Sequence, residues 1–229
     1  MIAPAETTAL LLSLRAATAA TAWLLPIGFC LAYGLARFRF RGRSLVNALV
    51  HLPLVLPPVV TGWALLTAFG VNGPVGRLLE PWGVRFAFDW SGAALAAGVM
   101  ALPLMVRPIR QALEAIDPRL ELAAETLGAS PWRRLRTITL PLALPGVFTG
   151  AALAFAKAFG EFGATITFVG AIPGETRTLP LEIYTALQTP GGEAAALRAS
   201  LLAAGVAVAA LAVSEWLAAV QARRGGARA

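Results

Sequence analysis

Residues 11–35 read LLSLRAATAATAWLLPIGFCLAYGL, with Arg15 as the single charged side chain in the stretch. A helix of about 20 apolar residues is long enough to cross the hydrocarbon core of a bilayer. Four further apolar stretches of this kind follow, at residues 46–70, 91–111, 142–169 and 195–219. Lys157 and Glu161 interrupt the stretch at 142–169. The pattern predicts five membrane-spanning helices.

The composition of the whole chain also indicates a membrane protein. Of its 229 residues, 58% are hydrophobic and 14% are charged, and the mean hydropathy is +0.71. A soluble protein of this size needs more charged side chains to cover its surface. In lipid every backbone N–H and C=O must be paired within the protein, which leaves helices or a closed barrel. The apolar runs lack the two-residue alternation of barrel strands, so we expect an all-α integral membrane protein with residues 1–229 in a single transmembrane domain.

Arginine residues are distributed unequally between the predicted loops. One group follows the first span, a second lies between the third and fourth spans, and a third ends the chain: Arg37, Arg39, Arg41 and Arg43; Arg107, Arg110, Arg119, Arg133, Arg134 and Arg136; Arg223, Arg224 and Arg228. With five spans all three groups fall on one side, and loops rich in Lys and Arg face the cytoplasm. We therefore expect the N-terminus on the outer side of the membrane and the C-terminus on the cytoplasmic side; the family resemblance described below implies a bacterial inner membrane, with the N-terminus in the periplasm.

The cytoplasmic loop at 112–141 carries signals for two helices. Asp117-Pro118 is typical of a helix start, with Asp as N-cap and Pro in the first turn. Gly128 can adopt the left-handed conformation that ends a helix. Ser130-Pro131 then starts a second helix, which we expect to end at Pro141. A helix–glycine–helix unit on this side of the membrane predicts docking onto another protein.

The sequence has no motif for catalysis or metal binding. Lys157 is the only lysine and Ala158 follows it, so the Gly-Lys-Ser/Thr of a P-loop is missing. His51 is the only histidine, which excludes a two-histidine zinc motif and argues against a Ser-His-Asp triad. Cys30 is the only cysteine and forms no internal disulfide. We expect this chain to be no enzyme by itself and to bind no cofactor or metal.

The predicted cytoplasmic loop at 112–141 also contains a long sequence motif whose spacing is matched without gaps. It reads Leu122-Ala123-Ala124-Glu125-Thr126-Leu127-Gly128 and, after nine residues, Ile138-Thr139-Leu140-Pro141. This resembles the EAA loop of bacterial ABC importer permeases, in which Glu-Ala-Ala is followed by three residues, Gly, nine residues and Ile-x-Leu-Pro. Leu122 stands where the motif has glutamate, and Glu121 precedes it.

The resemblance implies that this loop seats in a groove of a separate ATPase subunit and transmits its closure to the spans. Ala123, Ala124 and Gly128 lack bulk, which suits close approach to a partner. The positions with an implied role in ATPase coupling are Glu121, Ala123, Ala124, Gly128, Ile138, Leu140 and Pro141.

Four other stretches resemble the permeases of molybdate importers, within the molybdate- and sulfate-type importers. They are residues 51–62, HLPLVLPPVVTG; 160–169, GEFGATITFV; 172–178, IPGETRT; and 188–193, QTPGGE. The resemblance covers nearly the whole chain and implies a type I ABC importer permease fold that translocates molybdate. The implied partners are two copies of an ABC ATPase that hold ATP and Mg²⁺, a periplasmic molybdate-binding protein, a second copy of this chain and the lipid bilayer, with no nucleic acid. Tungstate and sulfate or thiosulfate remain alternative cargoes.

Candidate residues of the translocation path lie in the second and fourth spans. Lys157 and Glu161 are four residues apart, which places them on one helical face. A charge in the membrane costs about 2.5–3.5 kcal/mol on insertion scales, so the two form either a structural ion pair or a polar part of the path. Pro57-Pro58 predicts a kink or break, which either borders the path or only serves packing. Thr61 and Thr165 complete the candidates.

A rival function, an ion-coupled secondary transporter, would use Lys157 and Glu161 as a proton relay and needs no docking loop.

Overall fold

The computed structural model describes the backbone of residues 4–226 and the side chains of residues 4–212. Every regular element in this part of the chain is helical, which confirms the all-α expectation. The helices are α1 (Pro4–Arg37), α2 (Arg43–Val55), α3 (Pro58–Phe69), α4 (Pro74–Leu79), α5 (Trp90–Glu114), α6 (Pro118–Thr126), α7 (Pro131–Arg134), α8 (Leu140–Phe159), α9 (Gly163–Val169), α10 (Leu179–Leu187) and α11 (Glu193–Gly226), with short turns at Glu80–Trp82 and Leu135–Thr139. The side chains of Arg223 and Arg224, and all of Arg228, lie outside the described residues.

Four described helical stretches are long and apolar enough to cross a membrane, namely α1, α5, the run Pro131–Phe159 and the Glu193–Ala212 part of α11. The helices α2 and α3 together form a fifth candidate, with a bend of 114° between them. The bend falls at Pro57-Pro58, where Leu56 and Pro57 are non-helical and Pro58 opens α3. The break expected there is confirmed, because proline has no N–H with which to continue the hydrogen bonding of α2.

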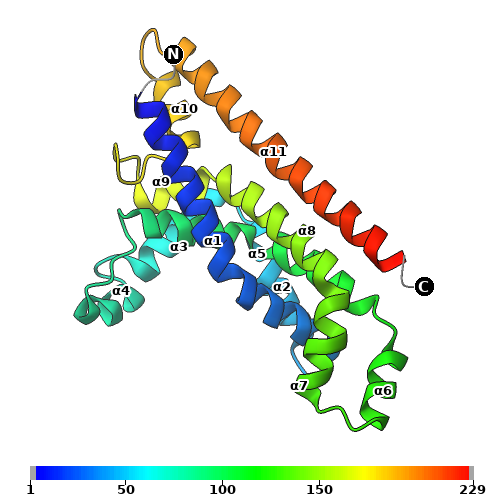
Figure 1. Ribbon diagram of the computed structural model, residues 1–229. Coiled ribbons are helices and arrows are strands. Elements are labelled where there is room, and N and C mark those ends of the chain that lie inside the picture. Colours follow the sequence, from blue (N-terminus) through cyan, green and yellow to red (C-terminus); the bar gives the residue numbers. More distant parts are fainter. Residues whose placement is uncertain (1–3, 227–229) are drawn as a thin grey trace.

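The helix α5 is the centre of the bundle. It packs against α1 and α8, while α11 lies along α8 and α10, and α3 packs on α9. In Figure 1 the start of α1, α10 and the start of α11 lie at one end of the molecule, and α6 and α7 lie at the opposite end. The predicted docking loop therefore lies at the end of the bundle opposite the start of α1 (Figure 1).

Two glycines let α8 approach α5 closely. A Cβ atom on Gly150 would lie 2.7 Å from the carbonyl oxygen of Met105, and one on Gly146 would lie 2.7 Å from that of Pro108. Small residues four positions apart are the usual means by which membrane helices pack at short distance, because lipid gives helices no hydrophobic reason to associate. This close contact packs α8, the long helix that follows the docking loop, against the central helix α5.

Two predictions about this part of the chain are wrong, one on the fourth span and one on the second helix of the docking loop. The helix expected at 142–169 instead ends at Phe159, and a separate short helix, α9, begins at Gly163. Two glycines flank this break, and the Glu161 side chain bonds to the first turn of α9, so two helices replace one.

The second helix of the docking loop also does not end at Pro141. A π turn at Leu135–Thr139 joins α7 to α8, and Leu140 N–H bonds to Leu135 O, five residues back. Pro141 then lies in the first turn of α8, where a missing N–H costs least.

Candidate functional site

The docking loop has the helix signals that the sequence predicts. The Oδ1 atom of Asp117 accepts the N–H two residues further on, at 2.9 Å, and so caps α6. Gly128 has a φ of +79°, and the N–H of Ala129 bonds to the carbonyl of Ala124 at 2.9 Å. This positive φ closes α6 and turns the chain back toward α7, as expected for glycine after a helix end.

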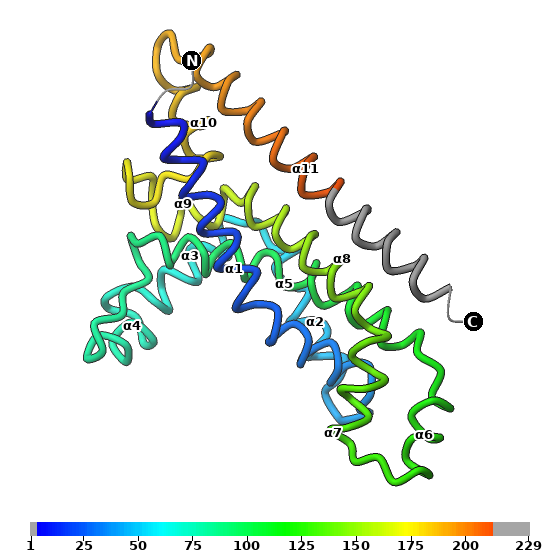
Figure 2. Tube along the Cα trace, viewed as in Figure 1, coloured from blue at the N-terminus to red at the C-terminus, as the bar shows by residue number. Residues whose placement is uncertain are grey.

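One face of α6 is an apolar stripe, which we define as Leu120, Ala123, Ala124 and Leu127. These residues follow the i, i+3, i+4, i+7 spacing of one helical face. No side chain of α6 is buried, and Leu120 and Leu127 are 48% and 87% exposed. Exposed contiguous apolar surface marks a contact site for another macromolecule. Figure 2 shows this helix standing clear of the bundle.

The other coupling candidates lie on the second leg of the loop. Ile138 is in the π turn, and Leu140 and Pro141 open α8. Ile138 is half-buried, whereas Leu140 and Pro141 are exposed. These three residues join the loop to the spans, while Ala123, Ala124 and Gly128 form its outer part.

Glu121 lies on a different face of α6 from the stripe and binds back to the bundle. Its Oε1 atom accepts hydrogen bonds from Arg37 Nη2 at 2.8 Å and from Thr139 Oγ1 at 2.7 Å. Glu125, one turn later, pairs with Arg134 of α7 at 2.5 Å. Glu121 thus connects α6 to the end of α1 and to the π turn before α8. Sequence reasoning missed Arg37 and Thr139 as its partners, because they are distant in the chain and no local pattern joins them.

Lys157 and Glu161 form an ion pair, with Nζ 2.5 Å from Oε2. The Glu161 side chain is 1% exposed and that of Lys157 is 30% exposed. Glu161 Oε1 also accepts the N–H of Ala164 at 3.1 Å, so the carboxylate caps the start of α9. This geometry favours the structural alternative for Glu161 and leaves Lys157 as the more accessible partner.

Thr61 and Thr165 lie on the two helices of the α3–α9 contact. They are 7% and 2% exposed, and Thr61 Oγ1 has no hydrogen-bond partner in the described part of the chain. A Cβ on the neighbouring Gly62 would lie 2.5 Å from Ala164 O, so the two helices meet there almost backbone to backbone. Of the four path candidates, Lys157 and Glu161 therefore form an ion pair, and the two threonines are packed in the contact between α3 and α9. The four residues do not line an open channel within one copy of the chain.

Comparison with known proteins identifies the family. Residues 25–224 match the family described as binding-protein-dependent transport system inner membrane component. The chain is 53% identical to the molybdenum transport system permease protein ModB of Escherichia coli K12, over 96% of this chain and 97% of that protein. The chain belongs to this permease family. A second ModB, from Haemophilus influenzae, is 53% identical over 93% of each chain.

A solved structure gives the fold independently. The permease superposes with a TM-score of 0.74 on a chain of a bacterial ABC transporter involved in the import of the acidic polysaccharide alginate, at 17% identity over 94% of this chain and 79% of that chain. The expected type I ABC importer permease fold is therefore confirmed.

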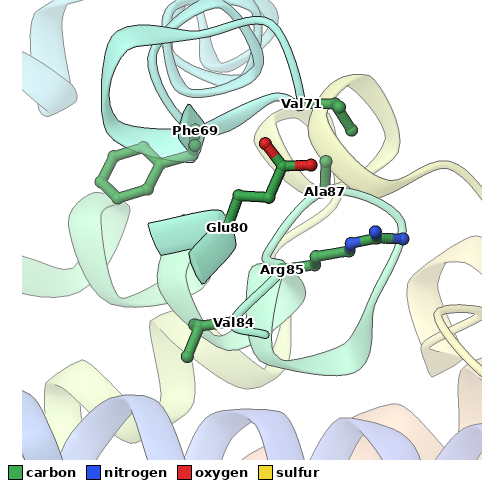
Figure 3. Close-up of a pocket in the computed structure, with 7 residues that line it drawn as sticks. Phe69, Val71, Glu80, Val84, Arg85 and Ala87 are labelled. Carbon is green, nitrogen blue, oxygen red and sulfur yellow. The ribbon is translucent and has the colours of Figure 1, made fainter. Parts of the chain in front are cut away.

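A small pocket beyond α3 is no candidate for cargo. It is lined by Phe69, Val71, Gly76, Glu80, Val84, Arg85 and Ala87 (Figure 3). Its volume of about 20 Å³ has room for about one water molecule. An oxyanion does not fit in it.

The ion pair of the permease gives a testable prediction. Glu161→Gln should destabilise the protein by about 1.5–3 kcal/mol, because the partly exposed Lys157 loses its charged hydrogen-bond partner. Lys157→Met combined with Glu161→Gln should recover much of this loss, as read from thermal unfolding in detergent. A double variant that is stable yet inactive in uptake would instead assign Lys157 and Glu161 to the path.

Proposed function

We propose that this chain is the membrane-spanning permease subunit of an ATP-driven importer that carries molybdate across the cytoplasmic membrane. The observation that carries the proposal is the exposed apolar stripe of α6, which stands at one end of the bundle within a matched EAA-type loop. This helix is capped at both ends but contributes no side chain to the core of the bundle. Its surface is therefore available for contact with a partner protein.

Energy for transport comes from that partner. The permease sequence has no P-loop, so ATP and Mg²⁺ are held by a separate ABC ATPase, and this chain binds no cofactor. Each permease copy offers one docking loop, so two copies engage two ATPase subunits.

Within one copy the helices pack closely around α5, so we place the polar passage at the interface between two copies of the chain.

Molybdate is the cargo that the family relationship favours, since the relatives at 53% identity are named for molybdenum transport. The family description, binding-protein-dependent transport, supports a periplasmic molybdate-binding protein as a further partner. Tungstate and sulfate or thiosulfate are the alternative cargoes. A secondary transporter is disfavoured because Glu161 is engaged with Lys157 and the start of α9, and because it would leave the stripe on α6 without a purpose.

The orientation follows from the arginine residues, with the N-terminus in the periplasm and α6 in the cytoplasm. Arg37, Arg43 and the loop arginines Arg133 and Arg134 gather at the α6 and α7 end. This distribution supports the positive-inside assignment.

Cysteine labelling tests this orientation. With Cys30→Ser as background, Asn72→Cys should react with a membrane-impermeant maleimide from the periplasm. Arg41→Cys should react only after the membrane is permeabilised. Both native side chains are exposed, so neither change disturbs the core. The reverse labelling pattern would overturn the orientation.

Complementation tests the cargo. In a bacterium that lacks its own molybdate permease, co-expression of this chain with its cognate ATPase and binding protein should restore accumulation of labelled molybdate at submicromolar concentration. Accumulation of sulfate but not of molybdate would replace the cargo assignment and leave the importer assignment intact.

A further inference from the structure

A polar pocket of about 290 Å³ lies between α2 and the last turns of α5. We call it the inner pocket; its lining residues are Asn47, His51, Arg107, Arg110, Gln111 and Glu114. This volume is more than ten times that of the pocket beyond α3, which has room for about one water molecule, so the inner pocket has room for a small ion with part of its hydration shell. Glu114 ends α5 and Pro118 begins α6, so the inner pocket adjoins the docking loop.

Arg110 is fixed in the inner pocket by two acceptors. Its Nε atom donates to Glu114 Oε1 at 2.8 Å, and its Nη1 atom donates to Asn47 Oδ1 at 2.9 Å. A guanidinium has five N–H groups, so further donors remain for a ligand. Arg43 Nη2 also lies 3.6 Å from Glu114 Oε1. The one carboxylate of the pocket is therefore shared by two arginines, and the pocket keeps a net positive charge.

Arg107 is the unengaged cation of the inner pocket. It is exposed, and within the described residues it has no ion pair or hydrogen bond, unlike Arg110 one turn later. Arg107, Arg110 and Gln111 are spaced i, i+3, i+4, so they share one face of α5. That face presents two guanidinium groups and an amide toward one cavity.

The side chains that α2 contributes to the inner pocket are also held by hydrogen bonds. His51 Nδ1 lies 2.8 Å from the backbone carbonyl of Asn47, and because a carbonyl only accepts, this nitrogen carries the hydrogen. The bond fixes the imidazole ring, and Asn47 in turn holds Arg110. Side chains from two helices are thus held in place around the unengaged Arg107.

We propose that the inner pocket binds the tetrahedral oxyanion at the cytoplasmic end of the path, with Arg107 as its principal ligand. Planar guanidinium groups form paired hydrogen bonds with oxyanions, and a cleft with net positive charge raises the local anion concentration. Arg107 is exposed in the single chain, and a ligand held by one exposed guanidinium is bound weakly enough to be released into the cytoplasm. This inference rests on the proposed function, and it gives Arg107 and Arg110 a role beyond setting orientation.

The test uses the complex of permease, ATPase and binding protein in nanodiscs, with Gln111→Cys in the Cys30→Ser background as reporter. Molybdate should slow modification of this cysteine by an anionic thiol reagent, whereas chloride at equal ionic strength should not. Arg107→Gln should raise the molybdate concentration for half-protection about tenfold, the loss expected for one charge-assisted hydrogen-bonding group. Arg107→Lys, which keeps the charge, should raise it less. Arg39→Gln, an exposed arginine outside the pocket, should leave it unchanged.

The outcomes separate the inner pocket from the function. If the complex without the cysteine reporter takes up molybdate but molybdate gives no protection, or if Arg107→Gln and Arg39→Gln behave alike, the inner pocket is not a binding site and the importer assignment stands. If sulfate protects and molybdate neither protects nor is transported, the oxyanion site is supported and the cargo assignment fails.

Discussion

Ala124→Trp is expected to abolish binding of the ATPase subunit, and with it ATP-driven uptake, while the permease stays folded in the membrane. Ala124 is the half-buried member of the otherwise exposed stripe of α6, so an indole there projects beyond the alanine into the space that the partner would occupy. Disruption at the centre of an interface costs 2 kcal/mol or more, which corresponds to a loss of affinity of about 30-fold or more. Affinity of the purified permease for the ATPase is the quantity to measure.

Leu122→Trp is the matched control for this change. Leu122 is exposed, precedes Ala124 by two residues, and lies about 100° or more around α6 from every residue of the stripe. It should bind the ATPase nearly as well as the unchanged permease. Gly128→Trp should fail like Ala124→Trp, because its φ of +79° is strained for any side chain. Unchanged ATPase affinity in both Ala124→Trp and Gly128→Trp would remove the coupling role of the loop.

Glu121→Ala is expected to uncouple ATP hydrolysis from transport without loss of ATPase binding. The carboxylate is bonded to Arg37 and Thr139, and through them α6 is joined to α1 and to the start of α8. Hydrogen bonds to charged groups are worth about 1.5–3 kcal/mol each, so their loss should lower molybdate uptake per ATP by about tenfold or more.

Glu125→Ala provides the control for Glu121→Ala. It removes the ion pair with Arg134, which lies wholly within the docking loop, and leaves the links to α1 and α8 intact. Uptake per ATP should therefore fall less. Equal ratios in Glu121→Ala, Glu125→Ala and the unchanged permease would show that force passes to the spans by another route.

The sequence predicts those features that depend on neighbours in the chain. The apolar runs, the break at Pro57-Pro58, the cap at Asp117 and the turn at Gly128 each depend on a few adjacent residues, and the structure has all of them. The resemblance of the loop at 122–141 supplied the fold and family, which the comparisons confirm.

The features that the sequence did not predict depend on contacts between distant residues. Glu161 was expected inside a helix, but its carboxylate caps α9 after a break that composition alone does not reveal. Glu121 meets Arg37 across 84 positions, and the inner pocket joins α2 to α5. Periodicity within one helix contains no information about which distant helix packs beside it.

Uptake by the reconstituted complex tests the central proposal most directly. Proteoliposomes that contain this permease and its ATPase, supplied with the molybdate-loaded binding protein, should accumulate labelled molybdate only when ATP is present on the ATPase side. Omission of the ATPase, or the Ala124→Trp variant, should reduce accumulation to background. Accumulation that persists without ATP, or that follows an imposed proton gradient instead, would contradict the assignment of this chain to an ATP-driven importer.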